Sequence, residues 1–257
     1  MFFGCTCKPQ EYTEVSRSGF DYAEFPCRII CEMEEDAFIA LCKLVESTGF
    51  PISGMNIYCP PEIIIAGPGY DADVARKYAQ TAAKRGHALG ARIIGIGAPR
   101  SRNIPDGYDR NLARKQLVEF LRITAGEFAA VGINAGMEAL GPCFCNFINT
   151  VSEAYEVVSE ADVENLMVLV DLYNMELSGE ADIELLKFVD RIGHAHTSDD
   201  DGSHTLRSYL KPDKYPLHEK RIRRLKETGY NGSLTIETDI AFDSARAQEC
   251  IQFLRSI

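Results

Sequence analysis

The chain alternates short apolar runs with longer segments of helical periodicity, eight times in succession. Strands that alternate with helices indicate βαβ units, in which consecutive strands are parallel and the helices cover the sheet. The apolar runs are nearly continuous, as is typical of strands buried on both faces. The expected strands span residues 2–5, 21–25, 52–57, 92–97, 133–138, 166–171, 191–196 and 233–237.

The amphipathic segments between these runs predict helices. They span residues 35–47, 71–87, 109–131, 152–160, 182–188, 217–228 and 244–254. Residues 7–20 show little periodicity and predict only a turn or a short helix. Eight units without a linker rich in Gly, Ser or Pro favour a closed (β/α)8 TIM barrel over an open sheet. Since 257 residues is the usual size of one such barrel, residues 1–257 are expected to form a single domain.

Two connections are longer than the others, at residues 98–108 and 197–216. Loops of this length in a compact domain are usually functional or disordered. Both follow a strand, so both are expected at the C-terminal mouth of the barrel, where barrel enzymes carry their active sites.

The charge and hydropathy of the chain exclude several classes of partner. With 38 acidic and 27 basic residues the net charge is −11, which argues against a nucleic-acid partner. The longest apolar runs, such as residues 167–170, fall far short of the roughly 20 residues that a membrane span needs. No signal peptide is recognisable, so we expect a cytoplasmic protein.

The nine cysteines do not indicate disulfides or a structural zinc site. Their number is odd, and one residue separates Cys5 from Cys7 and Cys143 from Cys145, whereas structural zinc sites use a spacing of at least two. We expect thiols that are buried or in loops, in a reducing compartment.

The last four expected strands all end in side chains that bind metals, namely Glu138, Asp171, His196 and Glu237. Adjacent parallel strands lie about 4.8 Å apart, so side chains at their C-terminal ends can converge on one ion. Three carboxylates and one imidazole suit Mn²⁺, Mg²⁺, Co²⁺ or Zn²⁺, and we expect Mn²⁺. A divalent ion would also compensate the clustered negative charge, without which at least one carboxylate should stay protonated.

Six segments of the chain resemble the xylose-isomerase-like TIM barrels, which include sugar isomerases, ketose 3-epimerases and related dehydratases. They are GFDYAEFP (19–26), ARIIGIGAPRSRNIPDGYDR (91–110), GMEALGPCFCNFINTVSEA (136–154), VDLYNM (170–175), IGHAHTSDDDG (192–202) and LKETGYNGSLTIE (225–237). The resemblance implies that Glu138, Asp171, Glu237 and the second histidine of the H-x-H segment, His196, bind the metal. His194 is then expected as a buried, hydrogen-bonded neighbour.

The resemblance also implies the chemistry. Metal-assisted removal of a proton beside the carbonyl of a ketose or related polyol-ketone would give an enediolate, with Glu138 and Glu237 as the acid–base pair. The alternative within this barrel type is a dehydratase of an inosose or a 3-dehydroshikimate-like substrate. Arg100 and Arg102 would then be candidates to clamp a carboxylate or phosphate.

Two departures from the family pattern concern the substrate. Asn174 stands where many members carry a histidine three residues after Asp171, and no arginine follows His196 closely. Arg207 is the nearest replacement for that arginine. Arg102, Asn174, Arg207 and Glu24 are therefore the expected substrate contacts, while residues 199–201 are expected to form a solvated turn.

Two other classes of function are weaker alternatives. Apurinic endonucleases share this barrel, but their three-zinc cluster needs more histidine ligands than the five histidines here can supply. A non-catalytic sugar-binding barrel is disfavoured by the complete ligand set. A homo-oligomer is left open.

Overall fold

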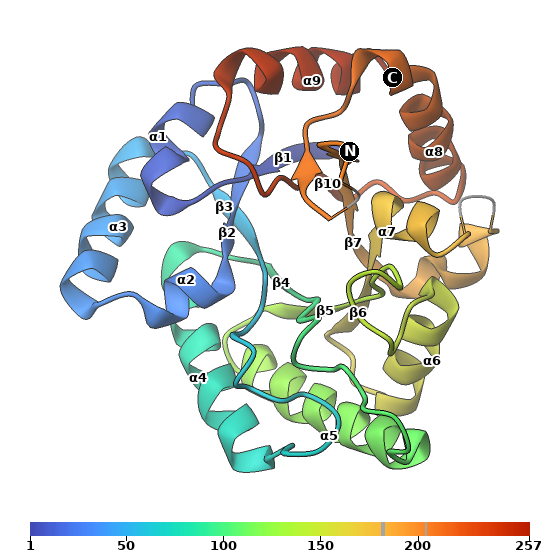
Figure 1. The fold of residues 1–257 in the computed structure, drawn as a ribbon. Helices are drawn as coiled ribbons and strands as arrows, with labels where there is room; N and C mark the ends of the chain where they lie inside the picture. The colour runs from blue at the N-terminus through green and yellow to red at the C-terminus, as the bar shows by residue number, and fades with distance from the viewer. Residues whose placement is uncertain (181–182, 204) are drawn as a thin grey trace.

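The computed structural model describes residues 1–180, 183–203 and 205–257, and within them eight parallel strands close into a barrel surrounded by helices (Figure 1). The order around the barrel is β1-β10-β7-β6-β5-β4-β3-β2, which confirms the predicted (β/α)8 architecture. The strands are β1 (Phe2–Thr6), β2 (Tyr22–Pro26), β3 (Ile52–Asn56), β4 (Ile93–Ile96), β5 (Asn134–Glu138), β6 (Leu166–Asp171), β7 (Ile192–Thr197) and β10 (Ser233–Ile236).

The helices lie outside the strands and cover the barrel (Figure 1). Four of them begin at an aspartate, Asp71, Asp109, Asp171 or Asp243, whose side chain accepts backbone N–H groups of the first turn. The helices are α1 (Tyr12–Val15), α2 (Cys27–Glu32), α3 (Glu35–Thr48), α4 (Ala72–Leu89), α5 (Arg110–Ala129), α6 (Val151–Ala161), α7 (Leu172–Leu177), α8 (Tyr215–Glu227) and α9 (Ser244–Ser256).

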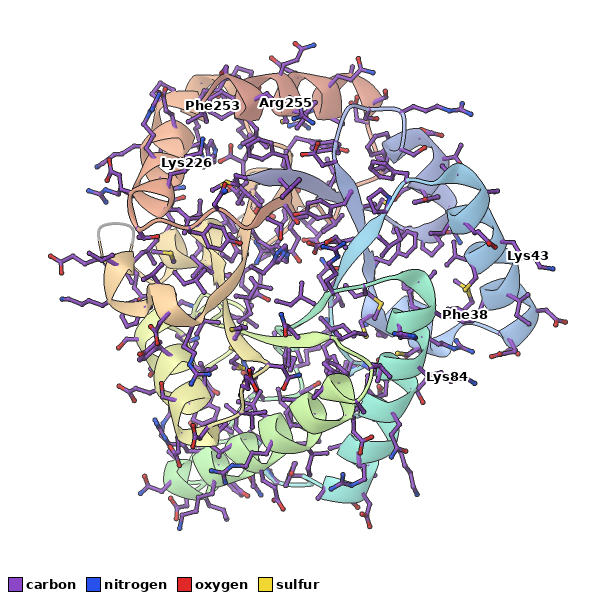
Figure 2. The ribbon with its side chains drawn as sticks, turned by 180° about the vertical axis from the view of Figure 1, so that it is seen from behind. Phe38, Lys43, Lys84, Lys226, Phe253 and Arg255 are labelled. Atoms are coloured by element: carbon purple, nitrogen blue, oxygen red, sulfur yellow. The ribbon has the colours of Figure 1, made fainter. Side chains whose placement is uncertain are left out.

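The barrel interior is filled by side chains, and glycines make room where neighbouring strands crowd one another. A Cβ atom on Gly193 would lie 2.6 Å from Cβ of Met167, and one on Gly95 would lie 2.8 Å from Leu169. Long charged side chains such as Lys43 project from the outer helices instead (Figure 2). The barrel therefore leaves its two ends as the places where ligands can enter.

Three helical segments differ from the prediction. Residues 182–188 were expected to form a helix; residue 182 lies outside the described residues, and a 3-10 helix spans Leu185–Arg191. Helices α2 and α7 follow β2 and β6 directly and were not predicted, since each has only six residues. The weakly periodic segment after β1 does form the expected short helix, α1.

The two long connections follow β4 and β7, as predicted. The loop after β7 contains a small antiparallel pair, β8 (Asp199–Asp200) and β9 (Arg207–Ser208). Asp199 and Asp200 are buried in this pair, so the expected solvated turn is wrong for these two residues. None of the nine cysteines, all of which lie in the described ranges, is part of a disulfide, as predicted. No described helix has the length and apolar character needed to cross a membrane.

Candidate metal centre

The four predicted metal ligands lie together at the carboxyl ends of neighbouring strands. Glu138 ends β5, Asp171 ends β6, His196 lies near the end of β7, and Glu237 directly follows β10. These strands are consecutive in the barrel. Each side chain offers one ligand atom, and these atoms all lie within 4.8 Å of one another. All four side chains are buried, so the strand ends form an enclosed cluster.

Asp171 both faces the cluster and starts helix α7. Its Oδ1 accepts the backbone N–H groups of Tyr173 (2.8 Å) and Asn174 (3.3 Å), which leaves Oδ2 available to the cluster. The side-chain amide of Asn174 donates to Oδ2 of Asp171 (3.2 Å) and to Oε1 of Glu138 (2.9 Å). Asn174, predicted as a substrate contact, thus bridges two carboxylates of the cluster.

The His196 ring lies between two glutamates. Its Nε2 is 3.1 Å from Oε2 of Glu24, and its Nδ1 faces Oε2 of Glu237 at 3.4 Å. The other oxygen of Glu24 lies 2.6 Å from Nε2 of His194 and accepts the hydroxyl of Thr235. Burial opposes the ionisation of Glu24, but the two adjacent imidazoles hold its pKa below the ordinary value.

Glu24 was predicted to contact the substrate, and the structure places it on the opposite side of His196 from Glu237. Its side chain is 1% exposed, and both oxygens are used by protein donors. Gly54 in β3 makes room for it, because a Cβ there would lie 2.9 Å from the carboxyl carbon of Glu24. This placement matches a residue that orients a metal-binding histidine through its second ring nitrogen.

Arg207 reaches the cluster from β9 in the loop after β7. Its NH1 lies 2.6 Å from Oδ2 of Asp171, and its Nε lies 3.2 Å from Oε2 of Glu237. The guanidinium carbon lies 5.4 Å from the ring centre of Tyr173 and 5.7 Å from that of Phe144. Arg207, predicted as a substrate contact, is therefore a buried cation beside the predicted ligands.

The structure does not bring Arg102 to the cluster. Its side chain is fully buried, and its guanidinium donates to the backbone carbonyls of Glu138 (2.8 Å) and Ile148 (3.3 Å). These contacts tie the loop after β4 to the loop after β5.

The two glutamates proposed as an acid–base pair differ in their electrostatic surroundings. Burial and the negative charges of Glu237 and Asp171 raise the pKa of Glu138 to about 8. Burial acts on Glu237 in the same direction, but Arg207 and His196 outweigh it and lower the pKa of Glu237 to about 2. One of the pair is therefore mainly protonated and the other ionised at neutral pH.

Two buried atoms of the cluster lack a hydrogen-bond partner among the described residues, Nδ1 of His196 and Oε2 of Glu237. Arg207 is close to that oxygen, but its Nε–H does not point at it well enough to form a hydrogen bond. Buried polar atoms are normally paired, and one cation would pair both. Three carboxylates and an imidazole suit a divalent ion, so the donor set fits a metal.

Asn56, the last residue of β3, is a site residue that the sequence reasoning missed. Its Nδ2 donates to Oε1 of Glu237 at 2.7 Å. The signal was present, because Asn56 is a polar side chain at a strand end like the predicted ligands.

A cavity of about 380 Å³ opens beside the cluster. Glu138, Glu237 and Arg207 line it together with Phe144 and Arg100. Small-molecule sites are typically clefts of about 300–1,000 Å³, so this cavity has room for a monosaccharide.

Comparison with known families gives one match over most of the chain. The family model described as xylose isomerase-like TIM barrel matches residues 12–257. Among curated proteins, no sequence matches this chain.

Solved structures of similar fold include enzymes with different reactions. The 3-keto-D-glucoside 4-epimerase from E. coli is 20% identical, with all of both chains covered and a TM-score of 0.76. The D-psicose 3-epimerase from Clostridium cellulolyticum H10 is 19% identical, with 100% and 99% covered and a TM-score of 0.80. A family 2 AP endonuclease from Brucella melitensis is 18% identical, with 100% and 99% covered and a TM-score of 0.74. At these identities the similarity shows the fold alone.

Proposed function

Because the chain belongs to the xylose isomerase-like TIM barrel family, we propose that it is a divalent-metal-dependent isomerase or epimerase of a ketose or related sugar. The observation that carries the proposal is the buried cluster of Glu138, Asp171, His196 and Glu237 beside a cavity of about 380 Å³. The sugar epimerases among the structurally similar proteins support this class. We expect Mn²⁺ as the metal, a small sugar as the partner and a cytoplasmic location.

The proposed acid–base pair lies on either side of the cluster. Glu138 is on β5 and Glu237 follows β10, with β6 and β7 between these strands, and both side chains line the cavity. A divalent ion held by the cluster would supply Lewis-acid polarisation of the sugar carbonyl and a template for the adjacent hydroxyl. One glutamate would remove the C–H proton beside the carbonyl to give an enediolate, and the other would return a proton to the opposite face. The hand of the substrate decides which glutamate is the base.

Two further side chains would assist this pair, the neutral Asn174 and the cationic Arg207. The amide of Asn174 donates to Glu138 and holds its carboxyl group in place. Arg207 lines the cavity and would donate to a substrate hydroxyl while its ion pair with Asp171 fixes the guanidinium.

Solvent isotope incorporation tests this function. During epimerisation in D₂O, one deuterium should appear at the carbon beside the carbonyl for each complete turnover, because the abstracted proton exchanges with solvent. Mass spectrometry or NMR of the product measures it, with EDTA-treated protein as the control. Product free of deuterium would indicate a hydride shift and contradict the enediolate mechanism.

The second candidate function is a dehydratase of an acidic substrate. It is supported by Arg100, an exposed cation that lines the same cavity and could bind an acidic group. Arg102 is buried on backbone carbonyls and does not add to such a clamp. A panel of neutral ketoses and acidic keto compounds separates the candidates: loss of water from an acidic keto compound would favour the dehydratase.

A further inference from the structure

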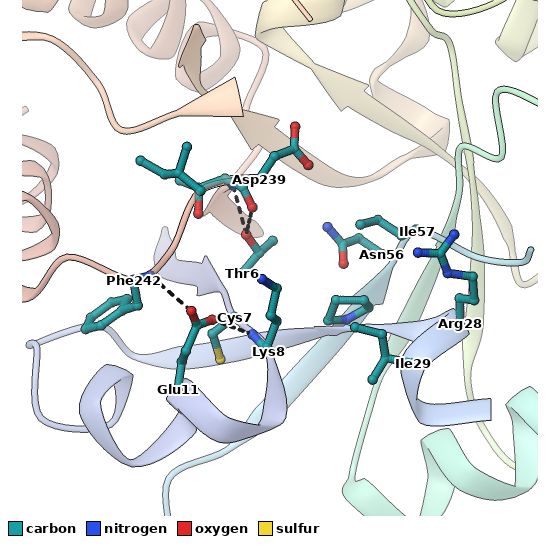
Figure 3. Close-up of a pocket in the computed structure, with 13 residues that line it drawn as sticks. Thr6, Cys7, Lys8, Glu11, Arg28, Ile29, Asn56, Ile57, Asp239 and Phe242 are labelled. Atoms are coloured by element: carbon teal, nitrogen blue, oxygen red, sulfur yellow. Dashed lines mark hydrogen bonds between the residues drawn. The ribbon is translucent and has the colours of Figure 1, made fainter. Parts of the chain in front are cut away.

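A second cavity lies at the same mouth of the barrel, beside the ends of β1, β2 and β3 (Figure 3). Its volume is about 130 Å³, and Lys8, Arg28 and Asn56 are among its lining residues. Ile57 and Asp239 line both this cavity and the larger one beside the metal cluster. The two cavities are therefore neighbours with a shared wall, so a substituent on a ligand in the larger one is close to the smaller one.

Asn56 connects the second cavity with the cluster. Its Nδ2 donates to Glu237 at 2.7 Å, and since a carboxylate oxygen facing a buried amide must accept, this bond fixes the orientation of the amide. The side chain is 4% exposed, and its Oδ1 has no hydrogen-bond partner within the described ranges. Buried amide oxygens are normally paired, so Oδ1 is an acceptor that a ligand hydroxyl at this cavity would satisfy.

The charges around the cavity balance one another. Lys8 and Arg28 are two cations that form no ion pair with the residues the structure describes, and Figure 3 draws them on either side of Asn56. Glu11 and Asp239 are two carboxylates in the same lining. Glu11 already accepts two backbone N–H groups, at 2.8 and 3.1 Å, and Asp239 accepts the backbone N–H of Arg207 at 2.9 Å. Two cations and two anions create no net attraction for a phosphate or carboxylate.

We propose that this second cavity binds hydroxyl groups of a neutral glycosyl substituent carried by the ketose, an inference that rests on the proposed function. A hydroxyl both donates and accepts, so it can donate to Oδ1 of Asn56 and accept from Lys8 or Arg28. Ile29 and Phe242 supply apolar surface in the same lining, against which the C–H face of a sugar can pack. The preferred substrate is thus a ketose linked to a second sugar rather than a free or phosphorylated ketose.

Three probes that differ only at carbon 6 of the ketose test this inference: D-fructose, isomaltulose with a glucosyl group, and D-fructose 6-phosphate. Isothermal titration of the Mn²⁺-loaded protein should give a Kd for isomaltulose about tenfold below that for D-fructose, equivalent to one or two net hydrogen bonds. D-Fructose 6-phosphate should bind no more tightly than D-fructose. The double variant Lys8→Met/Arg28→Met should remove most of the preference for isomaltulose. Lys43→Met, on the outer face of α3, is the matched control and should retain it (Figure 2).

Equal affinities for isomaltulose and D-fructose would overturn the inference while leaving the proposed function intact. Tightest binding of D-fructose 6-phosphate, lost in the double variant, would identify an anion subsite and overturn it as well. If Mn²⁺ binds but none of the three sugars does, the proposed function fails, and this inference fails with it. A titration with Mn²⁺ alone distinguishes that case from the loss of the metal site.

Discussion

Replacing Glu24 with glutamine tests whether this buried carboxylate fixes the orientation of His196. In the structure, Glu24 lies 3.1 Å from Nε2 of His196 and 2.6 Å from Nε2 of His194. Glutamine has nearly the same shape, but its NH₂ group cannot accept an imidazole N–H, and the negative charge is lost. The His196 ring would lose the partner that directs Nδ1 towards Glu237 and the other predicted ligands.

The expected loss of Mn²⁺ affinity in Glu24→Gln follows from what carboxylates that orient metal-binding histidines contribute. Removing a carboxylate that orients a metal-binding histidine typically weakens metal affinity by about 10–100-fold, or about 1.4–2.7 kcal/mol. The upper half of that range is expected here, because Glu24 is 1% exposed and no solvent can replace the lost acceptor. Glu24→Gln should therefore raise the Kd for Mn²⁺ by about 30–100-fold.

Isothermal titration with Mn²⁺ measures this Kd, and circular dichroism verifies that the variant is folded. Glu164→Gln, an exposed glutamate in the loop before β6, is the matched control and should bind Mn²⁺ as the unmodified protein does. Should Glu24→Gln fail to fold, Gly54→Ala provides a second route, since its Cβ would lie 2.9 Å from the Glu24 carboxyl carbon and displace it. A folded Glu24→Gln protein with unchanged Mn²⁺ affinity would refute the orienting role.

Removal of the metal, loss of either glutamate and acid titration give three further predictions. Adding Mn²⁺ at 100 times its Kd should raise the Tm of EDTA-treated protein by about 5 °C in calorimetry. This shift follows from a stabilisation of about 2.7 kcal/mol by binding and an unfolding entropy of about 0.5 kcal/mol/K for 257 residues. An unchanged Tm would exclude the metal site. Glu138→Gln and Glu237→Gln should each reduce kcat by about 10²–10⁴-fold, and near-normal turnover would remove that residue from the mechanism. Burial opposes ionisation of Asp199, but His218, the backbone N–H of Lys211 and Lys214 lower its pKa to about 2, so its stabilising effect is present above about pH 4 and lost as the pH falls through 2. Asp199→Asn should therefore lower the unfolding free energy at pH 7, and by only about 1–2 kcal/mol because solvent partly screens Lys214. Denaturant titrations should show that the difference in unfolding free energy between the unmodified protein and the variant becomes smaller by pH 3.

The predicted strand ends are correct for β5 and β6 and within one residue for the other barrel strands, because the barrel imposes a simple rule on them. Parallel strands buried on both faces give apolar runs that end where the chain reaches the mouth, so Glu138, Asp171 and Glu237 could be placed without knowing any contact. The same rule applies to Asn56 at the end of β3, so the sequence was sufficient to predict this residue as part of the site. Glu24 is no strand end, since it lies in the middle of β2, and its side chain serves His196 inside the barrel.

The contacts of Arg207 could not be predicted from the sequence. This residue reaches the cluster because β8 and β9 pair over two residues each, and strands this short leave no periodicity to detect. Arg102 shows the opposite limit, since its position after β4 resembled a substrate contact while its guanidinium bonds the backbone of Glu138 and Ile148. In both cases the outcome depends on how loops from different strands fold over the mouth.

The cluster is costly for a fold that needs only stability. Burial and two neighbouring carboxylates raise the pKa of Glu138 to about 8, so at neutral pH the folded chain must keep a carboxylic acid protonated that would ionise in water. Replacing buried charged groups with apolar ones of similar volume is often neutral or stabilising, and here three carboxylates face one arginine and one histidine. A divalent cation would offset this repulsion and would also pair the unpartnered atoms of His196 and Glu237. The same four side chains that weaken the isolated fold are therefore those that would bind the ion in the proposed reaction.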